Sequence, residues 1–278
     1  MSIAEIHGKT PFTYYEDILT ADVFAAFRYL PTQLGIYAFI CSIPGLSQKL
    51  PQLAGNENIT CTFHFWPFGE KHRREPDVLL ALQVGPRLFH IVVEAKYMSG
   101  ASDLEIQEIE QEGVVQRVGN QLGDQLRDLQ HGRYRLFQEG QRVQPHNLRS
   151  DPADRYLVYL TAHLLKPAEI QRALAIYPAA DGRLFWANWY QVFEHLQKLR
   201  PYLQTPPYSL ILQDICLLLD RKGFASFHGF RPLLAGHVHS QAASFWTEKI
   251  IDYPLFAGIA LPPDFVVQPT SAHFWSNE

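Results

Sequence analysis

Long hydrophobic runs are absent from this 278-residue chain. No apolar stretch reaches the roughly 18 residues that a membrane-spanning helix needs, and residues 1–7 have neither the basic start nor the apolar core of a signal peptide. Cysteine is scarce as well, since Cys41, Cys61 and Cys216 are an odd number, lie far apart and lack the spacing of a metal site. We therefore expect a cytoplasmic protein with reduced, buried thiols and no membrane partner.

An excess of basic charge is also missing. The chain has 24 Lys and Arg residues against 28 Asp and Glu residues, whereas nucleic-acid-binding proteins often carry a basic patch and a high pI. No glycine loop followed by Lys and Ser or Thr is present, which argues against an intrinsic NTPase. Hydrophobic residues make up 47% of the chain and aromatic residues 13%, so it can bury a sizeable core. Any contact with nucleic acid would depend on local charge.

The most informative stretch is a pair of expected strands with three charges at one end. Asp77 begins one apolar run, and after a turn at residues 85–86 a second run ends in Glu94-Ala95-Lys96. Antiparallel pairing would bring the three charges to the same edge of a sheet. Because side chains alternate along a strand, Glu94 and Lys96 would also share a face.

These residue types suit phosphodiester hydrolysis. Asp77 and Glu94 could share Mg²⁺ or Mn²⁺, because hard cations prefer oxygen ligands, and the Ala95 carbonyl could be a third ligand. Lys96 could hold or help to deprotonate an attacking water and offset the charge that develops on the phosphate. An alternative is a surface hairpin whose charges form only a structural ion pair, in a metal-free interaction protein.

Pro76-Asp77 followed by Glu94-Ala95-Lys96 resembles the motif of the PD-(D/E)XK nuclease superfamily. The resemblance extends over about residues 10–230 and is specific mainly at these positions, where the chain is similar to compact prokaryotic members associated with defence against foreign DNA. It implies an α/β fold with a restriction-endonuclease-like core, in which helices flank a mixed central β-sheet. It also implies a Mg²⁺-dependent endonuclease acting on DNA.

Two further site residues are expected on helices. Glu16 opens an expected helix that ends before Pro31, and the resemblance implies that this first helix supplies an acid to the metal site, with Asp17 as the neighbour that could replace it. A later helix carries Gln125, which borders an apolar stripe, and Gln121 is its nearest rival. The resemblance implies a glutamine there, and an amide can orient water or phosphate through hydrogen bonds.

Several basic residues could contact phosphates, although each could also be an ordinary solvated charge. They are Lys71, Arg73 and Arg74 before the Pro-Asp pair, and Arg117, Arg127, Arg133 and Arg135 in the next expected helical stretch.

The remaining periodicities predict alternating strands and helices, as in an α/β sandwich. Strands are expected at 59–66, 154–163 and 183–189, and helices at 17–30, 166–174, 189–199 and 209–222. His163 at a strand end is either a satisfied polar group or a phosphate contact. Residues 103–112 are acidic and favour a solvated helix face over a second metal cluster.

The chain divides into a nuclease-like domain, 1–230, and an extension, 231–278, that is rich in Phe, Trp and Pro. The extension packs on the core or forms a homodimer or partner contact. His237 and His239 within it lack further zinc ligands nearby. The sequence thus favours a DNA nuclease, with a non-cleaving nucleic-acid-binding or assembly subunit of the same fold as the alternative.

Overall fold

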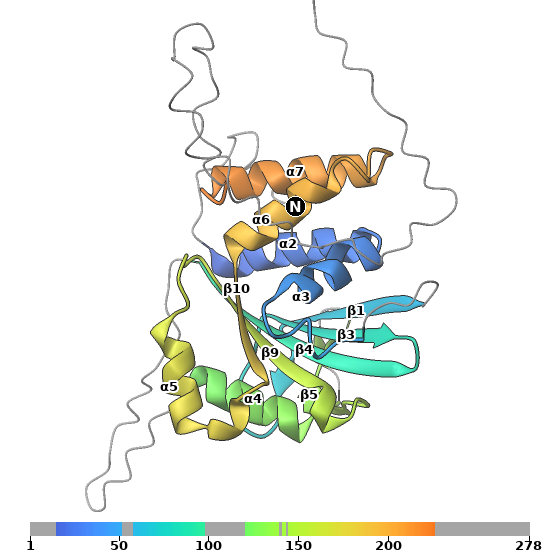
Figure 1. The fold of residues 1–278 in the computed structure, drawn as a ribbon. Coiled ribbons are helices and arrows are strands. Elements are labelled where there is room, and N and C mark those ends of the chain that lie inside the picture. Colours follow the sequence, from blue (N-terminus) through green and yellow to red (C-terminus); the bar gives the residue numbers. More distant parts are fainter. Residues whose placement is uncertain (1–14, 52–57, 98–119, 139–140, 143, 226–278) are drawn as a thin grey trace, which may run out of the picture.

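A five-stranded mixed β-sheet forms the centre of the protein in the computed structural model (Figure 1), which describes residues 15–51, 58–97, 120–138, 141–142 and 144–225. The sheet order is β1-β3-β4-β9-β10, and the strands β1, β3 and β4 are antiparallel, whereas β4, β9 and β10 run parallel. The strands are β1 (Ile59–Phe65), β3 (Val78–Val84), β4 (Arg87–Lys96), β9 (Arg155–Thr161) and β10 (Leu184–Asn188).

The register fixes which residues meet at one edge of this sheet. Val78, the first residue of β3, pairs with Val93 of β4, so Asp77 lies next to the end of β4. On the other side, Glu94 pairs with Tyr159 and Lys96 with Thr161 of the parallel strand β9. The start of β3 and the carboxyl ends of β4 and β9 therefore lie at the same edge, as the hairpin pattern predicts.

One face of the sheet is covered by helices from both ends of the described part of the chain (Figure 1). Their apolar residues, including Phe24, Phe27, Phe39 and Trp189, form the larger hydrophobic core with one face of the strands. These helices are α2 (Glu16–Tyr29), η1 (Gln33–Tyr37), α3 (Ala38–Ser42), α6 (Trp189–Leu199) and α7 (Tyr208–Arg221).

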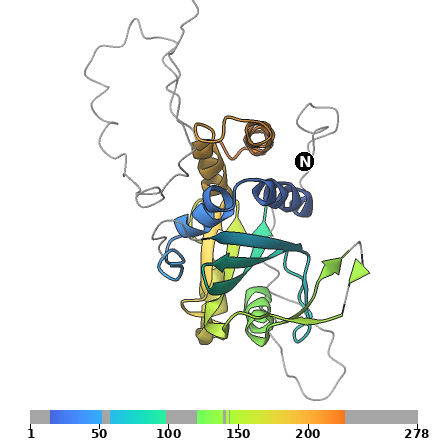
Figure 2. The same cartoon turned by 90° about the vertical axis from the view of Figure 1, so that its right-hand side faces the viewer.

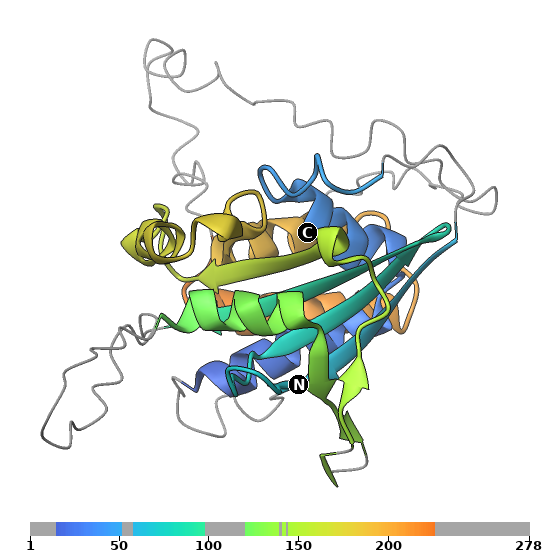
Figure 3. The same ribbon diagram turned by 90° about the horizontal axis from the view of Figure 1, so that it is seen from below.

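The opposite face is covered by α4 (Gln121–His131) and α5 (Ala168–Ile176), as Figures 2 and 3 show. Leu122, Leu126 and Leu129 of α4 pack there against Val92 and Tyr159 of the sheet. Strand β9 is buried along its whole length because helices lie on both of its faces. The expectation of a mixed α/β fold with a central sheet flanked by helices is confirmed.

A small second sheet contradicts part of the helix prediction. Arg133 and Arg135 were expected on the helical stretch that carries Arg127, but they belong to strand β5. Gly132 has a left-handed φ of 74° and its N–H bonds to the Asp128 carbonyl, which ends α4 before Arg133. The small sheets are β2 (Phe68–Gly69), β5 (Arg133–Arg135) and β8 (His146–Asn147) in one, and β6 (Phe137–Gln138) with β7 (Gln141–Arg142) in the other.

Other boundaries differ slightly from expectation. Asp154 lies in the 3₁₀ turn η2 (Pro152–Asp154), and His163 follows β9 in an exposed loop. A second 3₁₀ turn, η3 (Pro178–Ala180), follows α5. None of the helices in the described ranges combines the length and apolar character needed to cross a bilayer. Predictions for Arg117, the acidic 103–112 stretch, His237, His239 and the 231–278 extension lie outside the described residues.

Candidate active site at the sheet edge

Side chains from separate elements meet at the sheet edge where β3 begins and β4 ends. Helix α2 supplies Glu16, the residue before β3 is Asp77, β4 supplies Glu94 and Lys96, and α4 supplies Gln125. Ion pairs and hydrogen bonds join Glu16, Lys96, Glu94 and Gln125, and Asp77 is close enough to Glu94 for their charges to interact. The structure therefore brings together all five side chains that the sequence assigns to catalysis.

Lys96 occupies the centre of the group. Its Nζ lies 2.9 Å from Glu16 Oε1 and 2.8 Å from Glu94 Oε1. The other oxygen of Glu16 accepts a hydrogen bond from the Tyr97 backbone N–H at 2.9 Å. Asp17 is exposed at the next position of α2, so Glu16 is the acid that reaches the site. Both Glu16 oxygens therefore have partners within the protein, and in this arrangement Glu16 binds Lys96 and is not positioned as a metal ligand.

Glu94 is buried and is held by two amides as well as by Lys96. Gln121 Nε2 donates to Glu94 Oε1 at 2.6 Å, and Gln125 Nε2 donates to Glu94 Oε2 at 2.5 Å. The two glutamines are one helical turn apart, so both face the same carboxylate. The sequence left Gln121 and Gln125 as alternatives, whereas in the structure both donate to Glu94. Within the described part of the chain, Gln125 Oε1 is buried and has no hydrogen-bond partner.

Asp77 is the second buried acid at the edge. Its Oδ2 accepts a hydrogen bond from the Ala95 backbone N–H at 2.7 Å. Because the N–H and C=O of one strand residue point to the same side, the Ala95 carbonyl is directed towards Asp77 and away from the ladder with β9. The carbonyl that was expected to be a ligand is therefore on the correct side of β4 to act with Asp77.

Burial and like charge perturb these acids. Burial raises the pKa of Asp77 to about 8, the negative charge of Glu94 adds to the increase, and the Ala95 hydrogen bond and Lys96 oppose it. Burial also raises the pKa of Glu94, although Lys96 and Gln125 act against the change. For Lys96, burial favours the neutral amine, but the charge and hydrogen bond of Glu94 outweigh it and the pKa rises. Lys96 is therefore an ammonium that balances one of three nearby carboxyl groups.

The donor set has the chemistry of a site for a hard cation. Asp77, Glu94 and the Ala95 carbonyl offer only oxygen, which Mg²⁺ prefers. A cation would also relieve the repulsion from Glu94 that, after burial, contributes to the raised pKa of Asp77. However, no described group of three or more His, Cys, Asp or Glu side chains is arranged to hold a metal ion. A cation could therefore bind both acids only if Glu94 exchanged some of its present partners.

Of the basic residues expected to contact phosphate, the four nearest the site, Lys71, Arg73, Arg74 and Arg127, divide into two pairs. Lys71 and Arg73 are exposed. Arg74 Nη2 lies 3.1 Å from Asp124 Oδ2, and Arg127 Nη1 lies 3.1 Å from Asp124 Oδ1. The side chains of Arg74 and Arg127 are thus engaged within the protein, which leaves Lys71 and Arg73 as the better placed of the four.

Sequence reasoning missed a tryptophan behind the site. Trp189 Nε1 donates to the Lys96 backbone carbonyl at 3.1 Å, and the Trp189 ring lies 6.1 Å from that of Phe224. Phe224 also contacts the ring of Tyr97, with 5.4 Å between centroids. Local pattern gives no signal for such a contact, since Lys96 and Trp189 are 93 residues apart.

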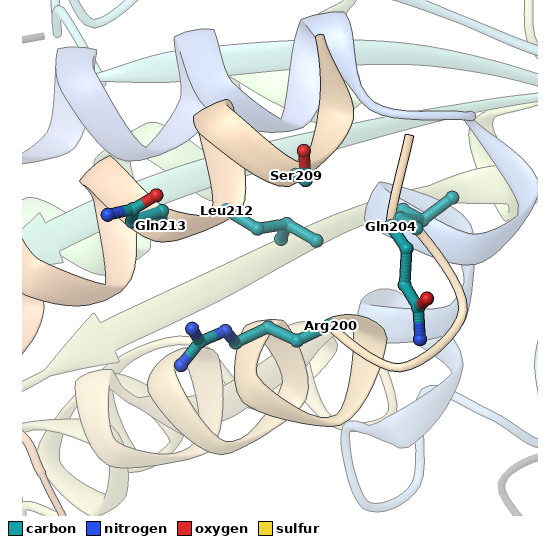
Figure 4. Close-up of a pocket in the computed structure, with 6 residues that line it drawn as sticks. Arg200, Gln204, Ser209, Leu212 and Gln213 are labelled. Carbon is teal, nitrogen blue, oxygen red and sulfur yellow. The ribbon is translucent and has the colours of Figure 1, made fainter. Parts of the chain in front are cut away.

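A pocket of about 220 Å³ lies elsewhere, between the end of α6 and the first turns of α7 (Figure 4). Its lining includes Arg200 and Gln204 but no carboxylate, histidine or cysteine. It is at the opposite end of α7 from Lys222, whose carbonyl accepts a hydrogen bond from Tyr97. The pocket is therefore separate from the carboxylate group.

His163, a further predicted phosphate contact, is exposed, and its backbone N–H bonds only to Thr161 Oγ1 among the described residues.

Comparisons of the chain with protein-family models, with curated proteins and with solved structures find no match.

Proposed function

We propose that this protein is a metal-dependent nuclease with a restriction-endonuclease-like core that hydrolyses phosphodiester bonds of DNA, in prokaryotic defence against foreign DNA. The observation that carries the proposal is the Lys96 ammonium, held 2.9 Å from Glu16 and 2.8 Å from Glu94, on the strand edge next to buried Asp77. This arrangement combines acids that could bind a cation with a positive charge that could orient the attacking water and stabilise the charge on the phosphate.

The roles follow from the positions of the donors. Asp77, Glu94 and the Ala95 carbonyl would hold Mg²⁺ or Mn²⁺, and the bound ion would supply Lewis-acid activation of water and phosphate. Lys96 would orient the attacking water and stabilise negative charge on the phosphate oxygens. Glu16 keeps Lys96 charged and in place through its ion pair. Gln125 would position water or phosphate through its amide.

A purely structural ion pair explains these residues less well. Asp77 is buried with its pKa raised to about 8, so it makes the folded state less favourable when it is ionised. A buried ion pair such as that of Glu94 with Lys96 is also weak support for stability, because removing two charges from water is costly. Strongly perturbed acids that lie together are typical of functional sites.

One observation favours the alternative, a non-cleaving nucleic-acid-binding or assembly subunit. Both Glu94 oxygens already bind Lys96, Gln121 or Gln125, and the described residues contain no ready three-ligand metal group. A protein that has lost metal binding could retain this closed network. In that case it would bind DNA without a dependence on Mg²⁺.

Plasmid cleavage separates the two functions. Supercoiled DNA would be incubated with the parent protein in Mg²⁺, Mn²⁺ or EDTA, beside Lys96→Ala and the control Lys198→Ala, which changes an exposed lysine on α6. We expect metal-dependent nicking or linearisation by the parent and control, and at least about 100-fold slower cleavage by Lys96→Ala. Equal rates for Lys96→Ala and the parent would refute the role of Lys96. No cleavage with any metal, despite DNA binding, would favour the non-cleaving subunit.

A further inference from the structure

The loop that precedes Asp77 is held in place by a single buried carboxylate. Asp128 of α4 is 1% exposed, and its Oδ1 accepts hydrogen bonds from the backbone N–H groups of Lys71 at 2.9 Å and His72 at 2.7 Å. Its Oδ2 accepts a third from the Arg74 N–H at 3.3 Å. Asp128 thus binds the backbone of Lys71, His72 and Arg74 and none of their side chains.

The loop is built to fit this carboxylate. A Cβ on Gly69 would lie 2.4 Å from Asp128 Oδ2, so only glycine permits the close approach. The Gly69 N–H bonds to the Arg74 carbonyl at 2.8 Å, and the Glu70 N–H bonds to the Arg133 carbonyl of β5 at 3.1 Å. Arg73 has a φ of 59°, in the left-handed region that non-glycine residues avoid. Such backbone strain persists only where the surroundings impose it, and it is concentrated at functional positions.

The side chains that this conformation presents are basic. Lys71 and Arg73 are exposed on the loop, and Arg133 and Arg135 are exposed on neighbouring β5, where Arg135 forms an ion pair with Glu70 of the loop. Segments 69–75 and 121–135 together hold six Lys or Arg and four Asp or Glu residues. Asp128 is buried, while Asp124 pairs with Arg74 and Arg127. A protein of net charge −4 therefore carries a local surface on which cationic side chains predominate.

Helix α4, the green helix of Figure 3, carries residues that bind both the loop and Glu94 of the site. Gln121 and Gln125 bind Glu94, and Asp128, one turn further along the same side, binds the loop. Residues at spacings of four and then three share one face of a helix. The helix therefore fixes the distance from Glu94 to the exposed loop cations, and the loop runs directly through Pro76 to Asp77.

We propose that residues 69–74 form a preorganised clamp for the phosphate backbone of a nucleic acid strand, and that Asp128 is its positioning residue. Lys71 and Arg73 contact phosphates on the strand that enters the site, and Asp128 sets the loop conformation from which they do so. The inference rests on the proposed function for its substrate class. It assigns the loop to nucleic acid because regularly spaced phosphates match several exposed cations next to a phosphodiesterase-type site.

Two substitutions that each remove one negative charge distinguish a charge effect on DNA binding from loss of the loop conformation. Asp128→Asn removes one negative charge, which alone would strengthen binding to DNA, whereas loss of the loop conformation would weaken it. Asp220→Asn, at an exposed position of α7, makes the same charge change away from the loop and is the matched control. Binding of the full-length protein to a fluorescent 20-base-pair duplex would be followed by anisotropy in EDTA between 50 and 200 mM salt, conditions that separate binding from cleavage.

We expect Asp128→Asn to bind about tenfold more weakly than the parent, and Asp220→Asn to bind at least as tightly as the parent. Lys71→Ala and Arg73→Ala should each weaken binding about three- to tenfold and reduce the slope of log affinity against log salt by about one. Because these two side chains are exposed, their variants test the clamp even if Asp128→Asn fails to fold. Parent-like affinity and salt slope in both would overturn the clamp, as would Asp128→Asn behaving like Asp220→Asn.

Plasmid cleavage separates this inference from the proposed function. If the Lys71 and Arg73 variants bind and cut like the parent while Lys96→Ala does not cut, the nuclease stands and the clamp is wrong. If no metal supports cleavage but binding depends on Lys71 and Arg73, the clamp stands and the nuclease is wrong. If the parent binds no DNA, the clamp is overturned.

Discussion

Replacing Asp77 by Asn should make the metal-free protein more stable, because the ionised carboxylate opposes folding. Asp77 has a pKa of about 8 in the folded protein against an ordinary value of 3.8. Between these values the folded chain binds a proton that the unfolded chain releases, so the free energy of unfolding falls as pH rises. Asn keeps an oxygen to accept the Ala95 hydrogen bond but cannot ionise.

The magnitude follows from the pKa difference. Each pKa unit corresponds to about 1.4 kcal/mol, so the interval from 3.8 to pH 7 gives an upper limit of about 4 kcal/mol. Asp77 is 7% exposed, so solvent screens part of its charge and the real effect is smaller than this limit. We therefore expect Asp77→Asn to add about 2 kcal/mol at pH 7 and about nothing at pH 4. The stability of the variant should change less than that of the parent between these pH values.

Urea denaturation in EDTA at pH 4, 5, 7 and 8 measures this difference, with Asp220→Asn as a control for the loss of one surface charge. Repeating the series in Mg²⁺ should raise the denaturation midpoint of the parent and leave that of Asp77→Asn unchanged, because ligand binding stabilises the state that binds it. The reasoning is refuted if Asp77→Asn is less stable than the parent at pH 8 in EDTA, or if both proteins lose stability equally as pH rises.

Two predictions concern the scaffold around the site. Arg155→Lys should lower the free energy of unfolding by about 3 kcal/mol, because lysine cannot reproduce the guanidinium hydrogen bonds to the carbonyls of Leu129, Gln130 and Ser150. Urea denaturation at pH 7 measures this loss. A loss below about 0.5 kcal/mol would contradict the prediction. Burial lowers the pKa of His195 to about 4, so the folded protein excludes a proton that the unfolded chain takes up, and stability is lost as pH falls from 6.5 to 4. His195→Gln should remove about 2 kcal/mol of the stability difference between pH 7 and pH 5, and an unchanged difference would show that other groups cause it.

The hairpin and its charges could be predicted from sequence because they depend on local pattern. Two apolar runs separated by a short turn fix the pairing of β3 with β4, and alternation then fixes which side chains share an edge. Glu16 could be placed only with the help of the resemblance, since it is 80 residues from Lys96 in the sequence. Its position at the start of an amphipathic helix is equally compatible with a helix-dipole role.

The loop and the small sheet could not be predicted in this way. Asp128 binds backbone groups that are 54 to 57 residues distant, and backbone hydrogen bonding leaves no mark on the residue types of the loop. The helical prediction ran through Gly132 to Arg135 because the basic residues continue without a change in composition. In the structure the left-handed φ of Gly132 ends the helix before Arg133. A Cβ at Gly132 would also lie 2.1 Å from Arg155 Nη1.

On the proposed function, Glu94 would have to exchange some of its present partners before it could hold a cation. Lys96 and the amides of Gln121 and Gln125 satisfy Glu94 in the absence of a cation, which offsets the cost of burying its charge. If Glu94 and Asp77 held a cation, Glu94 would no longer need the charge of Lys96, and Lys96 could face the water and phosphate. Because Glu16 also binds Lys96, the ammonium keeps one partner during this exchange and does not have to leave the site. The ion pair of Glu16 with Lys96 thus has a role in this exchange, which a purely structural ion pair would not have.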